Sequence, residues 1–459
     1  MISELWNKWF ERESSKLKKN NEGRPAKRRY FHFDSKLSDI NRKKTHELLE
    51  PESVAKHSFY PFIRIDTKKK RFHRVKGAQG KLGRREKTIK RRPIDYASHQ
   101  DSLVYSWYGF ILLDLYEQEL KKRGISENVI AYRSIKTEKG EGMTNIHFAK
   151  DAFDFIHSHA PCFVLALDVT KFFEEIDHSH LKHMWELMLG GKRLPDDHFN
   201  VFKNITEYRF VRMGRMISHV QNAQRKKLSR IFSTTQEFKK HIIDKHLQEK
   251  GKKGKGIPQG SPISPMLANL YMLEFDTVMA DKVREIGGLY RRYSDDILIV
   301  FPPEHSQMME NYVRSEIEKL SLFIKETKTE RRLCVENEGE VQALDPSSMK
   351  ASSFQYLGIE TDGTNRRIRH GSLARFQGRA NRQIRTVIEN AVSKKRKVQP
   401  KKYLHKKFGE PNGNFLAYTK RASKILNAPN IEHQVSPVRE SRRMKEKIEK
   451  ISKGTKRIK

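Results

Sequence analysis

Two neighbouring carboxylates stand at a turn within one of the most apolar stretches of the sequence. Asp295 and Asp296 follow Tyr293-Ser294 and precede Ile297-Leu-Ile-Val-Phe301. The pattern over residues 289–301 predicts a strand, a tight turn and a second strand. Two like charges repel each other at such a turn, and a divalent cation would relieve the repulsion. An isolated Asp-Asp pair also fits an ordinary solvated turn, so the surrounding sequence has to decide between the two interpretations.

A third carboxylate closes another predicted buried strand. Asp168 ends the apolar run that begins at Cys162, directly after Pro161. Three carboxylates that converge at strand ends could hold two Mg²⁺ ions roughly 3.5 to 4 Å apart. That arrangement activates an attacking hydroxyl and stabilises a leaving phosphate. Asp168, Asp295 and Asp296 are therefore candidates for the catalytic residues of a two-metal nucleotidyl transfer, and the neighbouring motifs have to decide between this interpretation and an ordinary turn.

The elements that must position these acids alternate between helical and strand patterns. Helical spacing of apolar residues predicts helices over 103–120, 146–157 and 264–280. A basic stretch, residues 68–92, separates a short strand pattern from the first of these helices and predicts a hairpin or loop that leads into it. The mixture predicts an α+β fold.

Length and charge limit the class of protein. The 459 residues exceed what one hydrophobic core usually serves, so two or three units are expected. Lys and Arg number 93 against 56 Asp and Glu, which leaves a net charge of +37. An excess this large favours a polyanionic partner, nucleic acid first, over the alternative of general solubilising charge. Residues 363–459 alone contain 28 Lys and Arg and 6 Asp and Glu.

The two cysteines and the apolar runs exclude other classes. Cys162 and Cys334 form no CxxC pair, so neither a disulfide framework nor a zinc knuckle is expected. The first residues lack a basic segment followed by an apolar one, and no apolar run approaches 18 residues. These observations predict a cytoplasmic protein without a membrane partner.

Six segments stand in the order of six motifs of retron and group II intron reverse transcriptases, and they resemble those motifs. They are Lys90 to Asp101, Asp168 to His178, Gly256 to Pro265, Tyr293 to Asp296, Leu320 to Thr329, and Phe354 to Gly358. In the second, an Asp is followed by paired aromatics and then by Ile-Asp-His. The third contains Pro-Gln-Gly, and the fourth is a Tyr-x-Asp-Asp box with Ser294 where many relatives carry Ala or Val.

The resemblance implies a right-hand polymerase, with fingers, a palm built on an antiparallel sheet, and a helical thumb. Residues 1–56 would then be an N-terminal extension, irregular or partly helical, whose role the sequence does not reveal. Residues 57–362 would form the fingers and palm. Residues 363–459 would form a basic helical thumb and tail. The implied activity is RNA-directed DNA synthesis on an RNA template, with two Mg²⁺ ions, or Mn²⁺ as a substitute.

The resemblance also assigns roles to single residues. The metal site would comprise Asp168, Val169, Asp295 and Asp296, and the nucleotide site Arg92, Phe173, Gln259 and Lys328. Arg92 would neutralise the triphosphate, Phe173 would exclude a ribose 2′-OH, Gln259 would contact the nucleotide sugar and templating base, and Lys328 would approach the pyrophosphate. The primer grip would comprise Phe354, Tyr356 and Gly358.

Each assignment has a structural alternative. Arg92 and Lys328 would be solvated cations, and Pro258-Gln259-Gly260 would be a helix entry capped by Ser261. Either Phe172 or Phe173, and the two aromatic residues of the primer grip, would be core.

Four further segments resemble antiphage defence-associated bacterial reverse transcriptases, in particular the smaller enzyme of their type three, two-polymerase system. They are Arg29 to Asp34, His57 to Phe62, Ile130 to Arg133, and Asn145 to Lys150. This resemblance implies a dedicated noncoding RNA as template and a second reverse transcriptase as partner, in a homo- or hetero-oligomer. A retron-type enzyme that makes RNA-linked DNA, and an RNA-binding scaffold without catalysis, are the alternatives.

Overall fold

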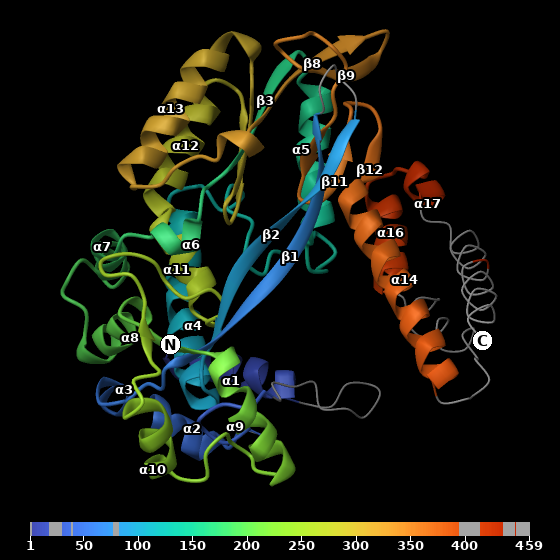
Figure 1. The fold of residues 1–459 in the computed structure, drawn as a ribbon. Coiled ribbons are helices and arrows are strands. Elements are labelled where there is room, and N and C mark those ends of the chain that lie inside the picture. Colours follow the sequence, from blue (N-terminus) through green and yellow to red (C-terminus); the bar gives the residue numbers. More distant parts are fainter. Residues whose placement is uncertain are drawn as a thin grey trace. The chain divides into compact units, whose positions relative to one another are not determined.

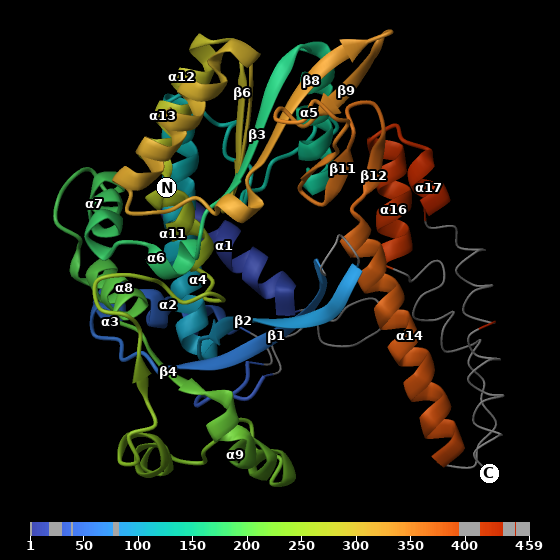
Figure 2. The ribbon, with the colours of Figure 1, turned by 45° about the horizontal axis from the view of Figure 1, so that its top comes forward.

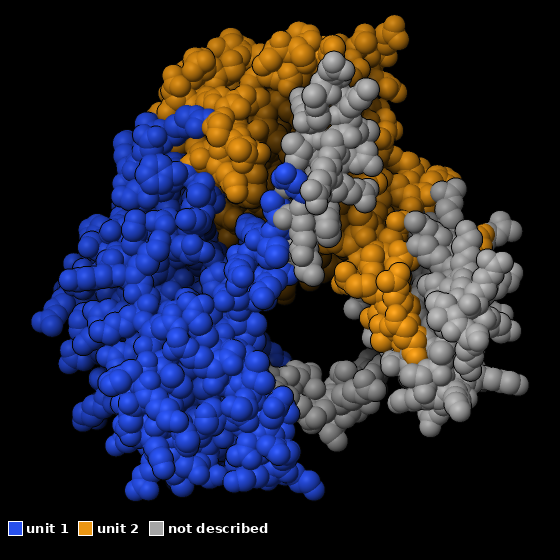
Figure 3. All heavy atoms as spheres, viewed as in Figure 1, with its two compact units in different colours: residues 1–132, 169–278, 314–323 blue, residues 133–168, 279–313, 324–459 orange. Residues whose placement is uncertain are grey.

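The computed structural model describes residues 2–17, 30–37, 40–76, 82–393, 414–434 and 446. Contacts along the chain divide it into two compact units, coloured separately in Figure 3. Unit 1 comprises residues 1–132, 169–278 and 314–323, and unit 2 comprises residues 133–168, 279–313 and 324–459. Four of the six predicted motifs fall within one unit, whereas those that begin at Asp168 and Leu320 cross from one unit to the other.

The N-terminal segment of unit 1 is largely helical. Helices α1 (Ile2–Leu17), α2 (Arg42–Leu49) and α3 (Pro51–Ala55) precede the first strand. Trp9 of α1 is fully buried, and its ring lies 5.5 Å from the ring of Trp107 in α4 (His99–Lys122). Its indole nitrogen donates a hydrogen bond to the hydroxyl of Ser106, at 3.1 Å. Helix α1 of the extension is thus packed into the core of unit 1.

A long antiparallel hairpin leads into α4, as the sequence predicted. Strands β1 (Phe62–Lys76) and β2 (Leu82–Tyr96) pair from Ile63↔Tyr96 onward. Strand β4 (Arg209–Arg212) pairs with β1 in parallel, and β5 (Glu249–Lys250) completes the order β2-β1-β4-β5. Figure 2 shows the hairpin extending from the helices of this unit.

Two Asp–His pairs, each with a buried carboxylate, hold earlier segments against the start of α4. His57 Nε2 lies 2.7 Å from a carboxylate oxygen of Asp101, whose other oxygen accepts the backbone N–H of Tyr60 at 3.0 Å. His99 Nδ1 lies 2.8 Å from a carboxylate oxygen of Asp34. Asp101, which ends the first resemblance motif, therefore has a structural role in linking segments distant in sequence.

The rest of unit 1 is mostly helical. Its remaining helices are α6 (Phe172–Glu175), α7 (His178–Met188), α8 (Asp196–Thr206), α9 (Met213–Arg225), α10 (Thr235–Phe238), a π-helix (Lys239–Ile243) and α11 (Ser264–Tyr271). The helix predicted over 264–280 is two helices, because α11 ends at Tyr271 and α12 (Leu273–Glu285) begins two residues later. Along the described ranges, no helix combines the length and the apolar character needed to cross a membrane.

Unit 2 is built on a five-stranded antiparallel sheet with the order β6-β7-β3-β8-β9. Its strands are β3 (Cys162–Asp168), β6 (Leu289–Tyr293), β7 (Asp296–Phe301), β8 (Glu330–Asn337) and β9 (Glu340–Leu344). The predicted hairpin and the predicted strand to Asp168 are both confirmed. Together with the helices, this antiparallel sheet confirms the α+β fold class.

A smaller sheet and several helices complete unit 2 (Figure 1). The three-stranded sheet contains β10 (Phe354–Tyr356), β11 (Ile359–Thr361) and β12 (Arg366–Ile368). The helices include α5 (Asn145–Ser158), α13 (Ser306–Lys319, whose last turn belongs to unit 1), α14 (His370–Ser393), α16 (Asn414–Ile425) and α17 (Asn430–Gln434), with short 3₁₀ turns at Pro303–His305 and Glu326–Lys328. One core cluster contains apolar residues from α5, β3, β10 and α16.

We expect Trp9→Ala to destabilise unit 1 by about 3 to 5 kcal/mol, because it removes a fully buried indole and leaves a cavity against α4. Denaturant unfolding followed by Trp fluorescence would measure the loss. Lys8→Ala is the matched control, because the Lys8 side chain on the same helix is exposed and should change stability little. Equal stability of Trp9→Ala and the parent would contradict a structural role for α1.

Candidate active site

The two strands that carry the predicted catalytic acids are hydrogen-bonded neighbours. In the antiparallel register of β3 and β7, Asp168 lies directly opposite Asp296. Directly opposed residues of an antiparallel pair have Cβ atoms about 4.5 to 5.5 Å apart. Asp295 precedes Asp296 in the turn between β6 and β7. Unit 2 therefore brings the three predicted acids to one end of its sheet.

The turn that carries these acids is tight and conformationally restricted. Tyr293 and Asp296 pair across the hairpin, which leaves Ser294 and Asp295 as the two central residues. Ser294 has a φ of 62° and is buried. Left-handed backbone is costly for a residue other than Gly, Asn or Asp, so the surroundings must hold it.

A buried arginine, which the sequence analysis missed, provides part of that support. Arg292 of β6 is fully buried, and its guanidinium donates a hydrogen bond to the carbonyl of Ser294 at 3.2 Å. A buried guanidinium has to be hydrogen-bonded to offset its desolvation. The sequence contains one indication of this role, which is the pair Arg291-Arg292 within a strand whose other residues are apolar or aromatic.

The electrostatics of the acids favour a bound cation. Desolvation by surrounding atoms, and then the negative charges of Asp295 and Asp168, raise the pKa of Asp296 to about 6, although the residue remains accessible at the surface. Asp168 forms an ion pair with the Lys328 ammonium. The lysine thus supplies one carboxylate with the kind of positive charge that a metal ion would supply.

These residues fit a divalent metal ion by their chemistry. Carboxylate oxygens are the ligands that Mg²⁺ prefers. Val169 has no side-chain ligand, so only its backbone carbonyl could contribute to the predicted metal site. In this structure, no group of three or more Asp, Glu, His or Cys side chains among the described residues is placed so that it could hold a metal ion.

The turn that carries Lys328 is attached to the catalytic strand. The backbone N–H of Lys325 donates to the carbonyl of Asp168 at 2.8 Å, directly before the 3₁₀ turn Glu326–Lys328. Arg331 of β8 holds the same turn through an ion pair with Glu326, at 2.7 Å. The position of Lys328 beside Asp168 is therefore fixed by the backbone and by a second ion pair.

In unit 1, a loop joins the segments that contain the predicted nucleotide-binding residues. The N–H of Ile257 donates to the carbonyl of Phe173 at 2.9 Å, and the carbonyl of Gln259 accepts the N–H of Asp95 at 2.7 Å. Asp95 lies on β2, three residues after Arg92. The backbone of the Pro-Gln-Gly loop thus connects the Phe173 segment with the strand that carries Arg92.

The side chains at this loop differ in exposure. Phe172 is buried, whereas Phe173 is only half-buried and lies 5.6 Å from it, measured between ring centroids. Gln259 is half-buried, and Arg92 is exposed. Of the two phenylalanines, Phe172 is therefore the core residue, and Phe173 remains available to a ligand.

Gly260 is required by the close approach of this loop to β2. Its φ is 116°, and a Cβ atom would lie 2.6 Å from the carbonyl oxygen of Asp95. The alternative in which Ser261 caps the next helix is wrong. Helix α11 begins after Ile263, and the buried Ser261 hydroxyl has no hydrogen-bond partner in the described part of the chain.

The predicted primer grip is a tight hairpin over a buried face. Phe354 and Tyr356 are both buried in the core of unit 2. The turn consists of Leu357 (φ 47°) and Gly358 (φ 90°), and Asn145 of α5 donates to the Leu357 carbonyl at 2.8 Å. The two aromatic rings therefore support the turn, and Gly358 lies in the turn itself.

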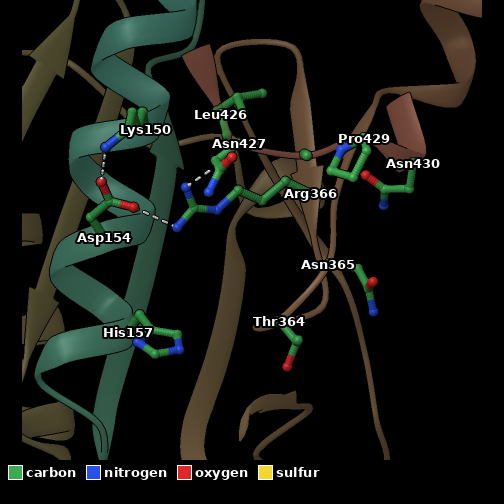
Figure 4. Close-up of a pocket in the computed structure, with 11 residues that line it drawn as sticks. Lys150, Asp154, His157, Thr364, Asn365, Arg366, Leu426, Asn427, Pro429 and Asn430 are labelled. Carbon is green, nitrogen blue, oxygen red and sulfur yellow. Dashed lines mark hydrogen bonds and ion pairs between the residues drawn. The ribbon is translucent and has the colours of Figure 1, made fainter. Parts of the chain in front are cut away.

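The structure also contains a polar cavity of about 660 Å³ in unit 2, lined by α5, the start of β12 and the turn between α16 and α17 (Figure 4). The Asp154 carboxylate forms an ion pair with Lys150 and accepts a hydrogen bond from the Arg366 guanidinium at 2.5 Å. Arg366 also donates to the Leu426 carbonyl at 3.4 Å. None of the predicted site residues lines this cavity.

Comparison with known proteins decides the family. Residues 111–361 match the reverse transcriptase (RNA-dependent DNA polymerase) family, and this range includes Asp168, Asp295 and Asp296. The chain belongs to the reverse transcriptase family. Reverse transcriptases generally use divalent metal ions, in agreement with the carboxylates found here.

Matches among solved structures include two telomerases. Apo telomerase from Candida tropicalis is 11% identical, with 64% of this chain and 49% of that chain covered and a TM-score of 0.38. Telomerase from Candida albicans, solved in complex with a fragment of telomeric RNA, is also 11% identical, with 88% and 64% covered and a TM-score of 0.38. The chain thus spans about half to two thirds of the length of these proteins.

We expect Gly260→Ala to disrupt the nucleotide-side loop, because the new methyl group would clash with the Asp95 carbonyl and strain a left-handed residue. The free energy of unfolding should fall by about 1 to 3 kcal/mol, and KM for the incoming nucleotide should rise. Denaturant titration and single-nucleotide extension would measure the two effects.

Gly254→Ala is the control for that experiment. Gly254 also has a positive φ, of 79°, but a Cβ atom there would meet nothing within 4 Å. If both variants raise KM equally, the close contact with β2 is not what orders the loop.

Proposed function

We propose that this protein is an RNA-directed DNA polymerase that joins nucleotides by two-metal transfer. The observation that carries the proposal is the register of β3 and β7, which sets Asp168 opposite Asp296 in a member of the reverse transcriptase family. Asp295, next to Asp296 in the turn, completes the proposed ligand set. The raised pKa of Asp296 supports it, since a bound cation would relieve the repulsion between these acids.

In the proposed mechanism, Asp168, Asp295 and Asp296 hold two Mg²⁺ ions, with the carbonyl of Val169 as a further ligand and Mn²⁺ as a possible substitute. Such ions, when bound, lower the pKa of the primer 3′-hydroxyl and neutralise the leaving pyrophosphate. Lys328 would leave Asp168 when the metal binds, and its ammonium would then be free to pair with the pyrophosphate. Its attachment through Lys325 keeps it close to the acids.

We propose nucleotide-binding roles for three residues of unit 1. Arg92 is exposed and would neutralise the triphosphate, and Gln259 would contact the sugar and the templating base. Phe173, half-buried and supported by the buried Phe172, would lie against the sugar and exclude a 2′-OH. The Leu357-Gly358 turn would hold the primer end, with Phe354 and Tyr356 beneath it.

We further propose that residues 57–362 act as fingers and palm and residues 363–459 as a thumb that clamps the duplex. Helix α14 supports this division, because Arg379, Arg382 and Arg385 are exposed at helical spacing, while Phe376 and Ala380 on the same helix are buried. Cations along one helix face suit phosphate contacts that do not depend on base sequence. The stretches 394–413, 435–445 and 447–459 of this proposed thumb lie outside the described residues.

The biological role belongs to the same proposal. The four segments that resemble defence-associated reverse transcriptases favour a cytoplasmic enzyme of antiphage defence. It would copy a dedicated noncoding RNA beside a second reverse transcriptase. Three of these segments contribute internal contacts, for example Asp34 to His99, His57 to Asp101 and Asn145 to the Leu357 carbonyl. Those contacts show that the residues help to hold the fold together, and they are not evidence for a defence role. The proposed role therefore rests on the sequence resemblance.

Asp295→Asn and Asp296→Asn should each lower the rate of primer extension by at least about a hundredfold, because loss of a metal ligand costs more than loss of a residue that only supports one. Primer extension on a defined RNA template with Mg²⁺ would measure it. Asp281→Asn is the control, since Asp281 is an exposed acid that pairs with Arg284. If the parent and both turn variants are equally active, Asp295 and Asp296 are not catalytic metal ligands. That result would favour the alternative of an RNA-binding scaffold without catalysis.

Phe173→Val should raise the use of ribonucleotides relative to deoxynucleotides by at least about tenfold, because a smaller side chain leaves room for the 2′-OH. Competing incorporation of the two nucleotides by the same preparation would measure the ratio. Phe172→Leu is the control, since Phe172 is core and its change should lower stability without changing the ratio. An unchanged ratio in Phe173→Val would show that this ring is not the gate.

The retron-type alternative differs in its product. That enzyme would leave DNA covalently attached to RNA, whereas the favoured proposal requires no such link. Sequencing the nucleic acid that copurifies with the protein, before and after ribonuclease treatment, would separate the two and would identify the template.

A further inference from the structure

A basic module lies between the second and third motifs, in residues 209–250. It contains 11 Lys and Arg and 3 Asp and Glu, a net charge of +8, more than twice its share of the +37 carried by all 459 residues. None of the residues assigned to catalysis, nucleotide binding or primer binding falls in it. We call this segment the basic module.

The basic module is folded around its own apolar residues. A core cluster of unit 1 joins Phe33 and Ile63 to module residues Val211, Met216, Ile231, Phe232 and Ile242. The ring of His241, in the π-helix, lies 4.9 Å from that of His219 in α9 and stacks on Phe232 at 5.5 Å. Helix α9 and the π-helix are therefore neighbours, and their outer side chains belong to one surface. Figure 2 shows α9 extending away from β4.

Six cations of this surface form no salt bridge within the described residues, although two exposed acids, Glu237 and Asp244, lie in the same segment of the sequence. All six are exposed: Arg225, Lys226, Lys227, Lys239, Lys240 and Lys245. Glu249 of the module instead forms a salt bridge with Arg212, at 2.9 Å, between strands β5 and β4. A cation at the end of α9 stabilises the helix dipole, but that effect is confined to the last turn and leaves the π-helix lysines unexplained.

Apart from Ile217, the exposed side chains of α9 are polar or basic, and none is acidic. They include Ser218, Gln221, Asn222 and Gln224. Hydroxyl and amide groups beside unpaired cations suit a ligand that offers phosphates together with neutral donors and acceptors. Double-stranded RNA is such a ligand, because its wide minor groove displays 2′-hydroxyls between two rows of phosphates.

We propose that the basic module binds double-stranded RNA, as a docking surface additional to the polymerase site. The basic module would hold a structured part of the RNA that the enzyme copies. In this respect the inference rests on the proposed function. The binding itself needs no catalysis. A protein partner is less well matched, since the exposed apolar residues of the module, Ile217 and Ile243, are accompanied by unpaired cations.

The test compares two full-length variants of equal charge. In the module variant, the six cations Arg225, Lys226, Lys227, Lys239, Lys240 and Lys245 are changed to Gln. The control variant changes six exposed cations elsewhere in unit 1 to Gln, namely Lys56, Lys121, Lys122, Lys192, Arg193 and Lys203. The probes are a hairpin RNA of about 20 base pairs and a DNA hairpin of the same sequence.

We expect the module variant to bind the hairpin RNA at least about tenfold more weakly than the control variant, with a smaller dependence of affinity on salt. The parent should bind the RNA hairpin more tightly than the DNA hairpin. Extension of a short primer–template should be unchanged. The Asp295→Asn and Asp296→Asn variants should keep their RNA binding, so failure of the polymerase proposal would be distinguishable from failure of this one.

Three results would overturn the proposal. Equal losses in the module and control variants would mean that total charge alone is responsible. Equal binding of the RNA and DNA hairpins by the parent would exclude recognition of RNA. Unchanged RNA binding by a folded module variant would show that this surface does not bind RNA. That conclusion would hold even if the variant had lost a protein partner. If that variant does not fold, Lys239→Glu with Lys240→Glu provides the same comparison with two exposed changes.

Discussion

The repulsion between carboxylates at the end of β3 and β7 is the constraint on which the functional part of this structure depends. Asp168 and Asp296 are directly opposed, and Asp295 adds a third negative charge in the adjoining turn. Such an arrangement is stable only if the backbone holds the acids in place and a positive charge lies nearby. The sheet provides the first condition, and Lys328 provides the second.

The supports around the acids are largely internal to the sheet. Arg292 holds the carbonyl of the left-handed Ser294 from within the core, and the Asp168 carbonyl holds the backbone of Lys325. Burial of Phe354 and Tyr356 likewise fixes the turn at Gly358. Arg292, Phe354 and Tyr356 therefore support the predicted site residues from within the core.

In unit 1 the loop of the Pro-Gln-Gly motif is positioned by its backbone. Its carbonyl and N–H groups bond to Asp95 and Phe173, and Gly260 allows the close approach to β2. This leaves the side chains of Gln259 and Phe173 free for recognition. The positive charge is distributed separately, with an arginine face on α14 and unpaired cations on the basic module, so binding of nucleic acid need not share residues with catalysis.

The amino-acid sequence was sufficient to predict the strand, hairpin and helix patterns around the acids, the α+β class and the likeness to reverse transcriptases. Apolar periodicity and motif order can be read directly along the chain. The three-dimensional structure was needed to show that Asp168 lies opposite Asp296, that Phe172 and not Phe173 is core, and that Ser261 caps no helix. It alone showed that Arg292 is buried, that Lys328 pairs with Asp168, and that the N-terminal extension packs on α4. These features depend on strand register and on contacts between residues far apart in the chain, which no local pattern encodes.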